Sequence, residues 1–72
     1  MPRTTVQSEV TGTVWKLEVR CGDSVQADQP LVILESMKME IPATAPVAGT
    51  VVELLVAEGE AVSEGQDLLV IA

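Results

Sequence analysis

The sequence predicts an all-β domain, built either as two packed antiparallel sheets or as a flattened barrel. Three observations lead to this fold class. The chain repeats itself internally, its apolar residues form short strand-like runs, and no amphipathic helix of useful length is present. The 72 residues are expected to form one domain, residues 1–72. A chain of this size buries only about 60% of its unfolded surface, so it depends on a dense apolar core.

The internal repeat has an offset of 37 residues. Residues 10–35 align with residues 47–72 without a gap, and 10 of the 26 aligned positions are identical. The identities include Val10, which aligns with Val47, and Gly12-Thr13-Val14, which aligns with Gly49-Thr50-Val51. We interpret the repeat as two similar β-halves related by a pseudo-twofold axis.

The first strand of each half is predicted from alternation of residue type. Residues 13–19 alternate with a period of two, and we expect the side chain of Trp15 to face inward with Leu17 and Val19. In the second half the equivalent inward residues are Val52, Leu54 and Val56. Residues 31–34 and 68–71 are short β-rich apolar runs, which favours strands covered on both sides.

The turns are predicted from glycine. Gly22 and Gly59 occupy equivalent positions where each half must reverse, and glycine readily adopts the positive φ that such turns require. Gly65 indicates a further turn in the second half. Its first-half equivalent is Asp28, which tolerates a left-handed backbone less easily.

The centre of the chain predicts a tight hairpin. Residues 31–36 lead into it and residues 39–44 lead out, so Met37 and Lys38 are its two central residues, as in a primed β-turn. Methionine and lysine are poor choices for such a turn, and a break of a local rule marks a functional candidate. Under the repeat, Lys38 aligns with Met1, so this hairpin is expected at one end of the domain and the chain termini at the other.

The segment Glu35-Ser36-Met37-Lys38-Met39-Glu40-Ile41-Pro42 resembles the attachment motif of the biotinyl, or biotin carboxyl carrier, domain of the biotinyl/lipoyl attachment family. The resemblance runs along essentially the whole chain. It implies eight strands in two four-stranded sheets and biotin linked to Lys38 by an amide bond. It also implies that Met37 and Met39 are recognised by biotin ligase and by carboxylase active sites. Glu35, Ser36 and Glu40 belong to the motif in a supporting role.

The resemblance implies a carrier function. A biotin protein ligase would join biotin to Lys38, a biotin carboxylase would load the arm, and a carboxyltransferase would pass the carboxyl group to an acyl-CoA or similar acceptor. Some family members carry a protruding thumb in the first half. Here residues 19–25 match residues 56–62 position for position, so a thumbless carrier is expected. The chain is either free-standing or an excised domain, and Met1-Pro2 favours the former.

Composition excludes most other classes of function. The chain has no histidine and one cysteine, Cys21, so we expect no catalytic residues, and its carboxylates lack a metal-ligand spacing. The net charge of −7 argues against nucleic acid and favours a monomer. No apolar run is long enough for a membrane helix. The unpaired cysteine and the absence of a signal peptide suggest the cytoplasm.

Two alternatives stay open. A lipoyl carrier domain of a 2-oxoacid dehydrogenase-type system would share the fold and the lysine position, although such domains typically read Asp-Lys-Ala where this chain reads Met-Lys-Met. The second alternative is an unmodified interaction module on the same scaffold. Such modules lack the motif lysine, which this chain retains.

Overall fold

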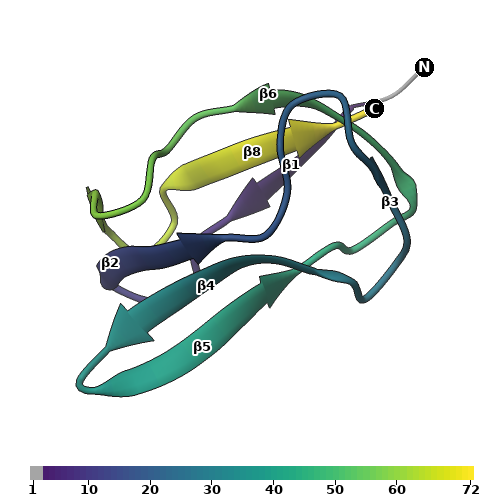
Figure 1. The fold of residues 1–72 in the computed structure, drawn as a ribbon. Helices are drawn as coiled ribbons and strands as arrows, with labels where there is room; N and C mark the ends of the chain where they lie inside the picture. The colour runs from purple at the N-terminus through teal and green to yellow at the C-terminus, as the bar shows by residue number, and fades with distance from the viewer. Residues whose placement is uncertain (1–2) are drawn as a thin grey trace.

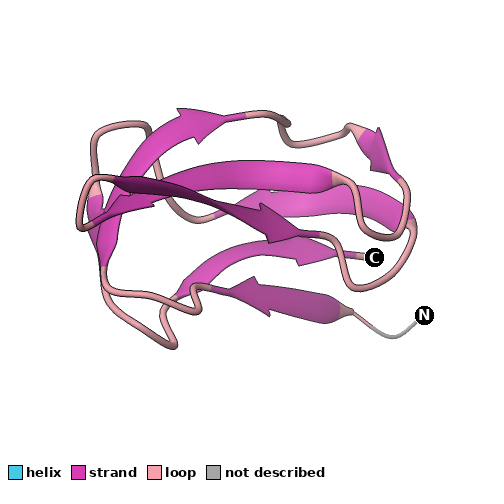
Figure 2. Ribbon diagram, turned by 90° about the horizontal axis from the view of Figure 1, so that it is seen from below, coloured by secondary structure: helices cyan, strands magenta, loops and turns pink. Residues whose placement is uncertain are grey.

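The computed structural model describes residues 3–72, which form two four-stranded antiparallel sheets packed face to face (Figures 1 and 2). No helix is present in this range, as predicted. The eight strands are β1 (Thr4–Gln7), β2 (Gly12–Leu17), β3 (Ser24–Val25), β4 (Pro30–Ser36), β5 (Met39–Thr44), β6 (Gly49–Leu54), β7 (Ala61–Val62) and β8 (Asp67–Ile71).

The sheet topology shows the predicted pseudo-twofold symmetry. One sheet has the order β1-β8-β6-β3 and the other β5-β4-β2-β7, so each strand has a counterpart 37 residues away at the same place in the other sheet. The loop hydrogen bonds repeat as well. The Gly22 amide donates to the Val51 carbonyl at 2.7 Å, and the equivalent Gly59 amide donates to the Val14 carbonyl at 2.7 Å.

The core lies between the sheets and is aliphatic. Its largest fully buried side chains come from both halves: Leu31, Leu34, Val14 and Val32 from the first, and Leu68, Leu69, Ile71, Val51 and Val62 from the second. A two-layer fold buries one face of each sheet, and this shared core holds the two halves together.

The predicted direction of Trp15 is wrong. Val14 is fully buried instead, and Trp15 is 51% exposed. The register of β2 against β4 shifts between Val14 and Lys16, which makes Trp15 the extra residue of a β-bulge. Because the bulge adds one residue, the alternation of inward and outward side chains shifts by one position beyond it. Val19 is therefore buried, as Val14 is.

The second half contains the same bulge. The register of β6 against β8 shifts between Val51 and Glu53, so Val51 is buried and Val52 is only half-buried. The prediction that the Val52 side chain points inward is therefore wrong too, whereas Val56 is buried as predicted. Simple alternation of residue type could not reveal these bulges, because each adds one residue to an otherwise regular strand.

The apolar run of β8 is buried throughout, Val70 included, as cover on both sides predicts, whereas the run of β4 is buried except for Ile33. Leu31 and Val32 are consecutive and both fully buried, as are Leu68 and Leu69. Leu31 has no partner in the register of β4 with β5, and Leu68 has none in the register of β8 with β1. Each is an extra residue, so its side chain and that of the next residue both point into the core. Ile33 faces away from this core and is only half-buried.

The turns follow the glycine pattern. Gly22, Gly59 and Gly65 have φ values of 98°, 86° and 85°, and Asp28 adopts the same left-handed region with φ of 69°. The connections at Gly22 and Gly59 make matching hydrogen bonds and are equally short, so the first half contains no thumb. No helix within residues 3–72 has the length and apolar character needed to cross a membrane.

Candidate functional site

The β4–β5 hairpin closes in the predicted primed turn. Ser36 pairs with Met39 as the last cross-strand pair, which leaves Met37 and Lys38 as the two central residues. Their φ values are 53° and 65°, the left-handed pair that a type I′ turn requires. Side chains with a Cβ pay roughly 1–2 kcal/mol per residue for this conformation. The turn lies at the end of the domain opposite Ala72 and the start of β1, as the repeat predicts (Figure 1).

The turn presents its side chains to solvent. Met37 is 91% exposed, Met39 is 62% exposed, and Lys38 between them is exposed. Within residues 3–72, Lys38 forms no salt bridge. A free amine on a rigid turn fits the attachment of an acyl group, because an incoming carboxyl group meets no competing partner. The flexible thioethers beside it can adapt to several protein surfaces.

Two carboxylates flank the lysine. Glu35 and Glu40 face each other across the hairpin in direct register, and both are exposed. Like charges directly opposite each other on neighbouring strands are destabilising, so this pair does not serve the fold. Glu35 also pairs with Thr13 of β2, so the acidic pair lies on the outer face of the sheet that carries Lys38. The predicted motif residues are therefore brought together at one end of the domain.

Sequence reasoning missed a contact that holds the hairpin in place. The Ser36 hydroxyl donates a hydrogen bond of 3.0 Å to the Thr11 carbonyl in the β1–β2 loop. Beside it, a Cβ on Gly12 would overlap the carbonyl oxygen of Glu35. The repeat carries a signal of this close approach at Gly12, because Gly12 aligns with Gly49. A Cβ on Gly49 would meet the carbonyl oxygen of Ala72 in the same way. We call Thr11, Gly12 and Ser36 the hairpin clamp.

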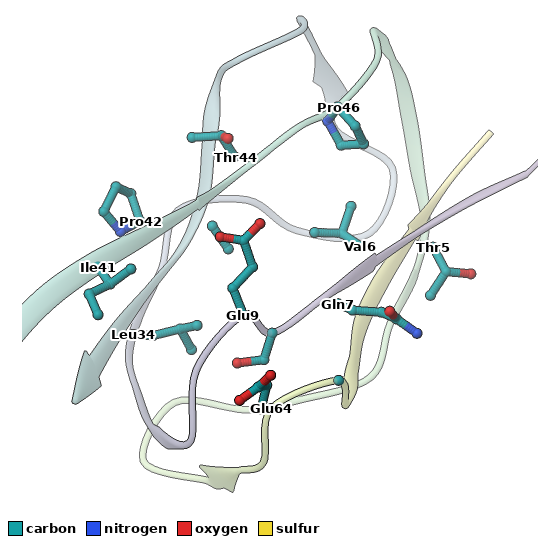
Figure 3. A pocket seen from close by; sticks show the side chains of 13 residues that line it. Thr5, Val6, Gln7, Glu9, Leu34, Ile41, Pro42, Thr44, Pro46 and Glu64 are labelled. Atoms are coloured by element: carbon teal, nitrogen blue, oxygen red, sulfur yellow. The ribbon is translucent and has the colours of Figure 1, made fainter.

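A groove of about 480 Å³ lies away from the turn, between the edge strands β1 and β5 (Figure 3). Under the pseudo-twofold these two strands are equivalent. Figure 3 shows Ile41, Pro42 and Thr44 on one side, Thr5, Val6 and Gln7 on the other, and Glu9 between them. Its lining includes none of residues 35–40, so the groove is separate from the hairpin site.

The remaining chemical candidates lie apart from the hairpin. Cys21 is exposed in the turn beside Gly22, and its thiol donates a hydrogen bond to the Val52 carbonyl at 3.2 Å. Among residues 3–72 no group of histidine, cysteine and carboxylate side chains is arranged to hold a metal ion. The hairpin is thus the candidate site.

Comparison with known proteins connects this site to a family. The family model described as "Biotin-requiring enzyme" matches residues 1–71. The biotin/lipoyl attachment protein of Bacillus subtilis is 46% identical over 65 residues, which cover 90% of this chain and 89% of that protein.

Longer proteins contain a similar region. The biotin carboxyl carrier protein of Streptococcus mutans is 44% identical over 94% of this chain, and this chain spans about half (52%) of its length. The solved structure of a single-chain, multi-domain long-chain acyl-CoA carboxylase aligns with a TM-score of 0.89 and 35% identity. That alignment covers 94% of this chain and 7% of the carboxylase.

Proposed function

This chain belongs to the biotin/lipoyl attachment family, and from that premise we propose that it is a biotin carboxyl carrier with Lys38 as its attachment residue. The observation that supports Lys38 is its position: an exposed amine without a salt bridge, at the second central position of a primed turn. The chain is a carrier and not itself an enzyme, because its relatives are carrier proteins or small parts of carboxylases.

Biotin, when bound, supplies a ureido nitrogen that accepts a carboxyl group in one active site and releases it in another. The residues of this chain bind and present the arm. The Lys38 ammonium would lose two protons, and its charge, in becoming the amide N–H, while the activated carboxyl group of biotin releases its leaving group. Met37 and Met39 would supply apolar contacts on either side, and the rigid sandwich would hold the arm away from the core. A tethered arm makes each delivery effectively intramolecular once the carrier is docked.

We assign three partners to this site. A biotin protein ligase modifies Lys38, a biotin carboxylase loads the arm, and a carboxyltransferase unloads it onto an acyl-CoA or similar acceptor. The relatives of the chain support its action with biotin-dependent carboxylases in general. In isolation we expect a monomer, since a net charge of −7 on 72 residues makes copies repel one another.

The function is tested by loading and discharge. The chain is biotinylated by a biotin ligase and then incubated with a biotin carboxylase, ATP and labelled bicarbonate. The proposal predicts label on the chain that depends on ATP and on prior biotinylation. In parallel, the unmodified chain is offered to a lipoate ligase with lipoate. Lipoylation without biotinylation would establish the lipoyl alternative, and modification by neither ligase would establish an interaction module.

A further inference from the structure

The outer face of the sheet that carries Lys38 contains an exposed apolar patch. Trp15, the extra residue of the β2 bulge, and its neighbour Lys16 both oppose Ile33 of β4, and Ile33 pairs with Pro42 of β5. Val14 and Leu34, in the next row, point into the core. The row of Trp15, Ile33 and Pro42 therefore faces outward, and we call it the Trp15 face. Trp15 is 51% exposed, Pro42 is exposed and Ile33 is half-buried.

The fold does not require a large side chain at this place. The pseudo-twofold puts Val52, Val70 and Thr5 at the positions equivalent to Trp15, Ile33 and Pro42. Val52 occupies the same bulge position with the same register shift. The half without the lysine therefore builds the same backbone with a valine. The sole aromatic residue of the chain lies on the lysine-bearing sheet and is half-exposed.

The Trp15 face continues into the hairpin. Along β4, Glu35 lies two residues beyond Ile33 on the same outer face, and along β5, Glu40 lies two residues before Pro42. The surface thus runs from an apolar row, through an acidic row, to the exposed turn. Attachment of biotin to Lys38 would remove the positive charge next to Glu35 and Glu40. Lys16, beside Trp15, keeps its charge and lies 3.9 Å from Glu18, so the loaded carrier offers an apolar patch with the carboxylates of Glu35 and Glu40 between it and the turn.

We propose that the Trp15 face is the docking surface for the biotin carboxylase, which covers it with an apolar socket bordered by basic side chains. This inference rests on the proposed function. Trp is the residue type most enriched where binding energy concentrates. The acidic row complements a surface near an active site that binds two anions, ATP and bicarbonate, and complementary charge speeds and orients docking.

The ligase is the less suitable occupant for a physical reason. Its reacting atom is Lys38 Nζ, so it can recognise the carrier at the turn itself. Strand β4 runs three residues beyond Ile33 to Ser36, roughly 10 Å, before the turn that carries Lys38 begins. The carboxylase reacts instead at the far end of the arm, where the carrier and free biotin present the same chemical group. Any preference for the carrier must therefore come from contacts with the protein body.

The experiment compares Trp15→Val with two controls. Trp15→Val copies the residue that the second half uses at this position. Leu55→Ser removes an apolar side chain of similar exposure, 46%, outside the Trp15 face. Free biotin serves as a second substrate. Each variant is biotinylated to completion, checked by intact mass, and titrated into a biotin carboxylase that accepts the wild-type carrier.

Trp15→Val is expected to raise the KM for the carrier at least tenfold, with kcat, free-biotin carboxylation and the ligation rate unchanged within twofold. Leu55→Ser should match the wild type, and salt should raise the wild-type KM. An unchanged KM for Trp15→Val would overturn the proposal, as would a defect in ligation alone. Failure of the proposed function is distinguishable, because the wild-type chain would then acquire no biotin.

A direct readout uses the single tryptophan. With fluorotryptophan incorporated, the carrier gives one fluorine signal, which should shift or broaden when unlabelled carboxylase is added to the biotinylated chain. A signal that stays unchanged at carboxylase concentrations that saturate the activity would contradict docking on this face.

Discussion

The two halves of the molecule differ far more in what they expose than in how they fold. Both build the same strands, the same bulges and the same turn hydrogen bonds. The first half continues into an exposed Met-Lys-Met turn with two left-handed residues. Only the first half carries the hairpin clamp and an exposed tryptophan. Features shared by both halves serve the fold, and features that break the symmetry mark the site.

The symmetry of the core is tested by equivalent truncations, which should have the largest effects on stability. Leu31→Ala and Leu68→Ala each remove a fully buried side chain at the same bulge position. Each should lower the free energy of unfolding by about 2–5 kcal/mol, and the two values should agree within roughly 1 kcal/mol. Urea denaturation measures both. A large cost at one position and a negligible cost at the other would show that the halves do not share one core.

The clamp is tested by adding the same methyl group to each half. A Cβ on Gly12 meets the Glu35 carbonyl, and one on Gly49 comes within 2.6 Å of the Ala72 carbonyl. Gly12→Ala and Gly49→Ala should each cost about 1–3 kcal/mol, because the strands must separate. Only Gly12→Ala should also slow ligation of the folded protein. Equal ligation rates for the two variants, after correction for the folded fraction, would show that the clamp does not position the turn.

The backbone strain at Met37 and the contribution of Met37 to ligation should respond in opposite ways to one substitution. Asparagine adopts the left-handed region more readily than methionine, so Met37→Asn should raise stability by about 0.5–1 kcal/mol. That corresponds to roughly 2–8 °C in Tm for a domain of this size. Ligation should become slower, because an apolar contact is lost. A scanning calorimetry trace and a ligation time course measure the two effects. If the variant were ligated as fast as the wild type, Met37 would be only a turn residue.

The smallest effect is expected at the third turn. Asp28 and Gly65 are equivalent, and both have positive φ. Asp28→Gly should stabilise the fold by about 0.5 kcal/mol, and Gly65→Asp should destabilise it by a similar or somewhat larger amount. Asp28 bonds Ala45, beyond the end of the β4–β5 pairing that is opposite the turn, so Asp28→Gly should leave the ligation rate unchanged. Shifts of the same sign in the urea midpoints would contradict the equivalence of the two turns.

Much of the fold was predictable because the repeat predicts two equivalent β-halves and glycine marks the turns. The hairpin at Met37 and Lys38 was predictable for the same reason. The direction of Trp15 was not, since a bulge adds one residue and the flanking pattern still resembles alternation. The hydrogen bond from Ser36 to Thr11 joins residues 25 apart in sequence, and local patterns carry no record of such a contact.

The central claim is that the residue that breaks the symmetry at the turn, Lys38, carries the biotin. The most direct test is the intact mass of the chain after incubation with a biotin ligase, ATP and biotin, followed by peptide mapping. The control is Lys38→Arg, which keeps the charge and removes the acceptor amine. The account predicts one biotinyl group on Lys38 and none on the folded variant. Biotin on Lys16, or on Lys38→Arg, would contradict it.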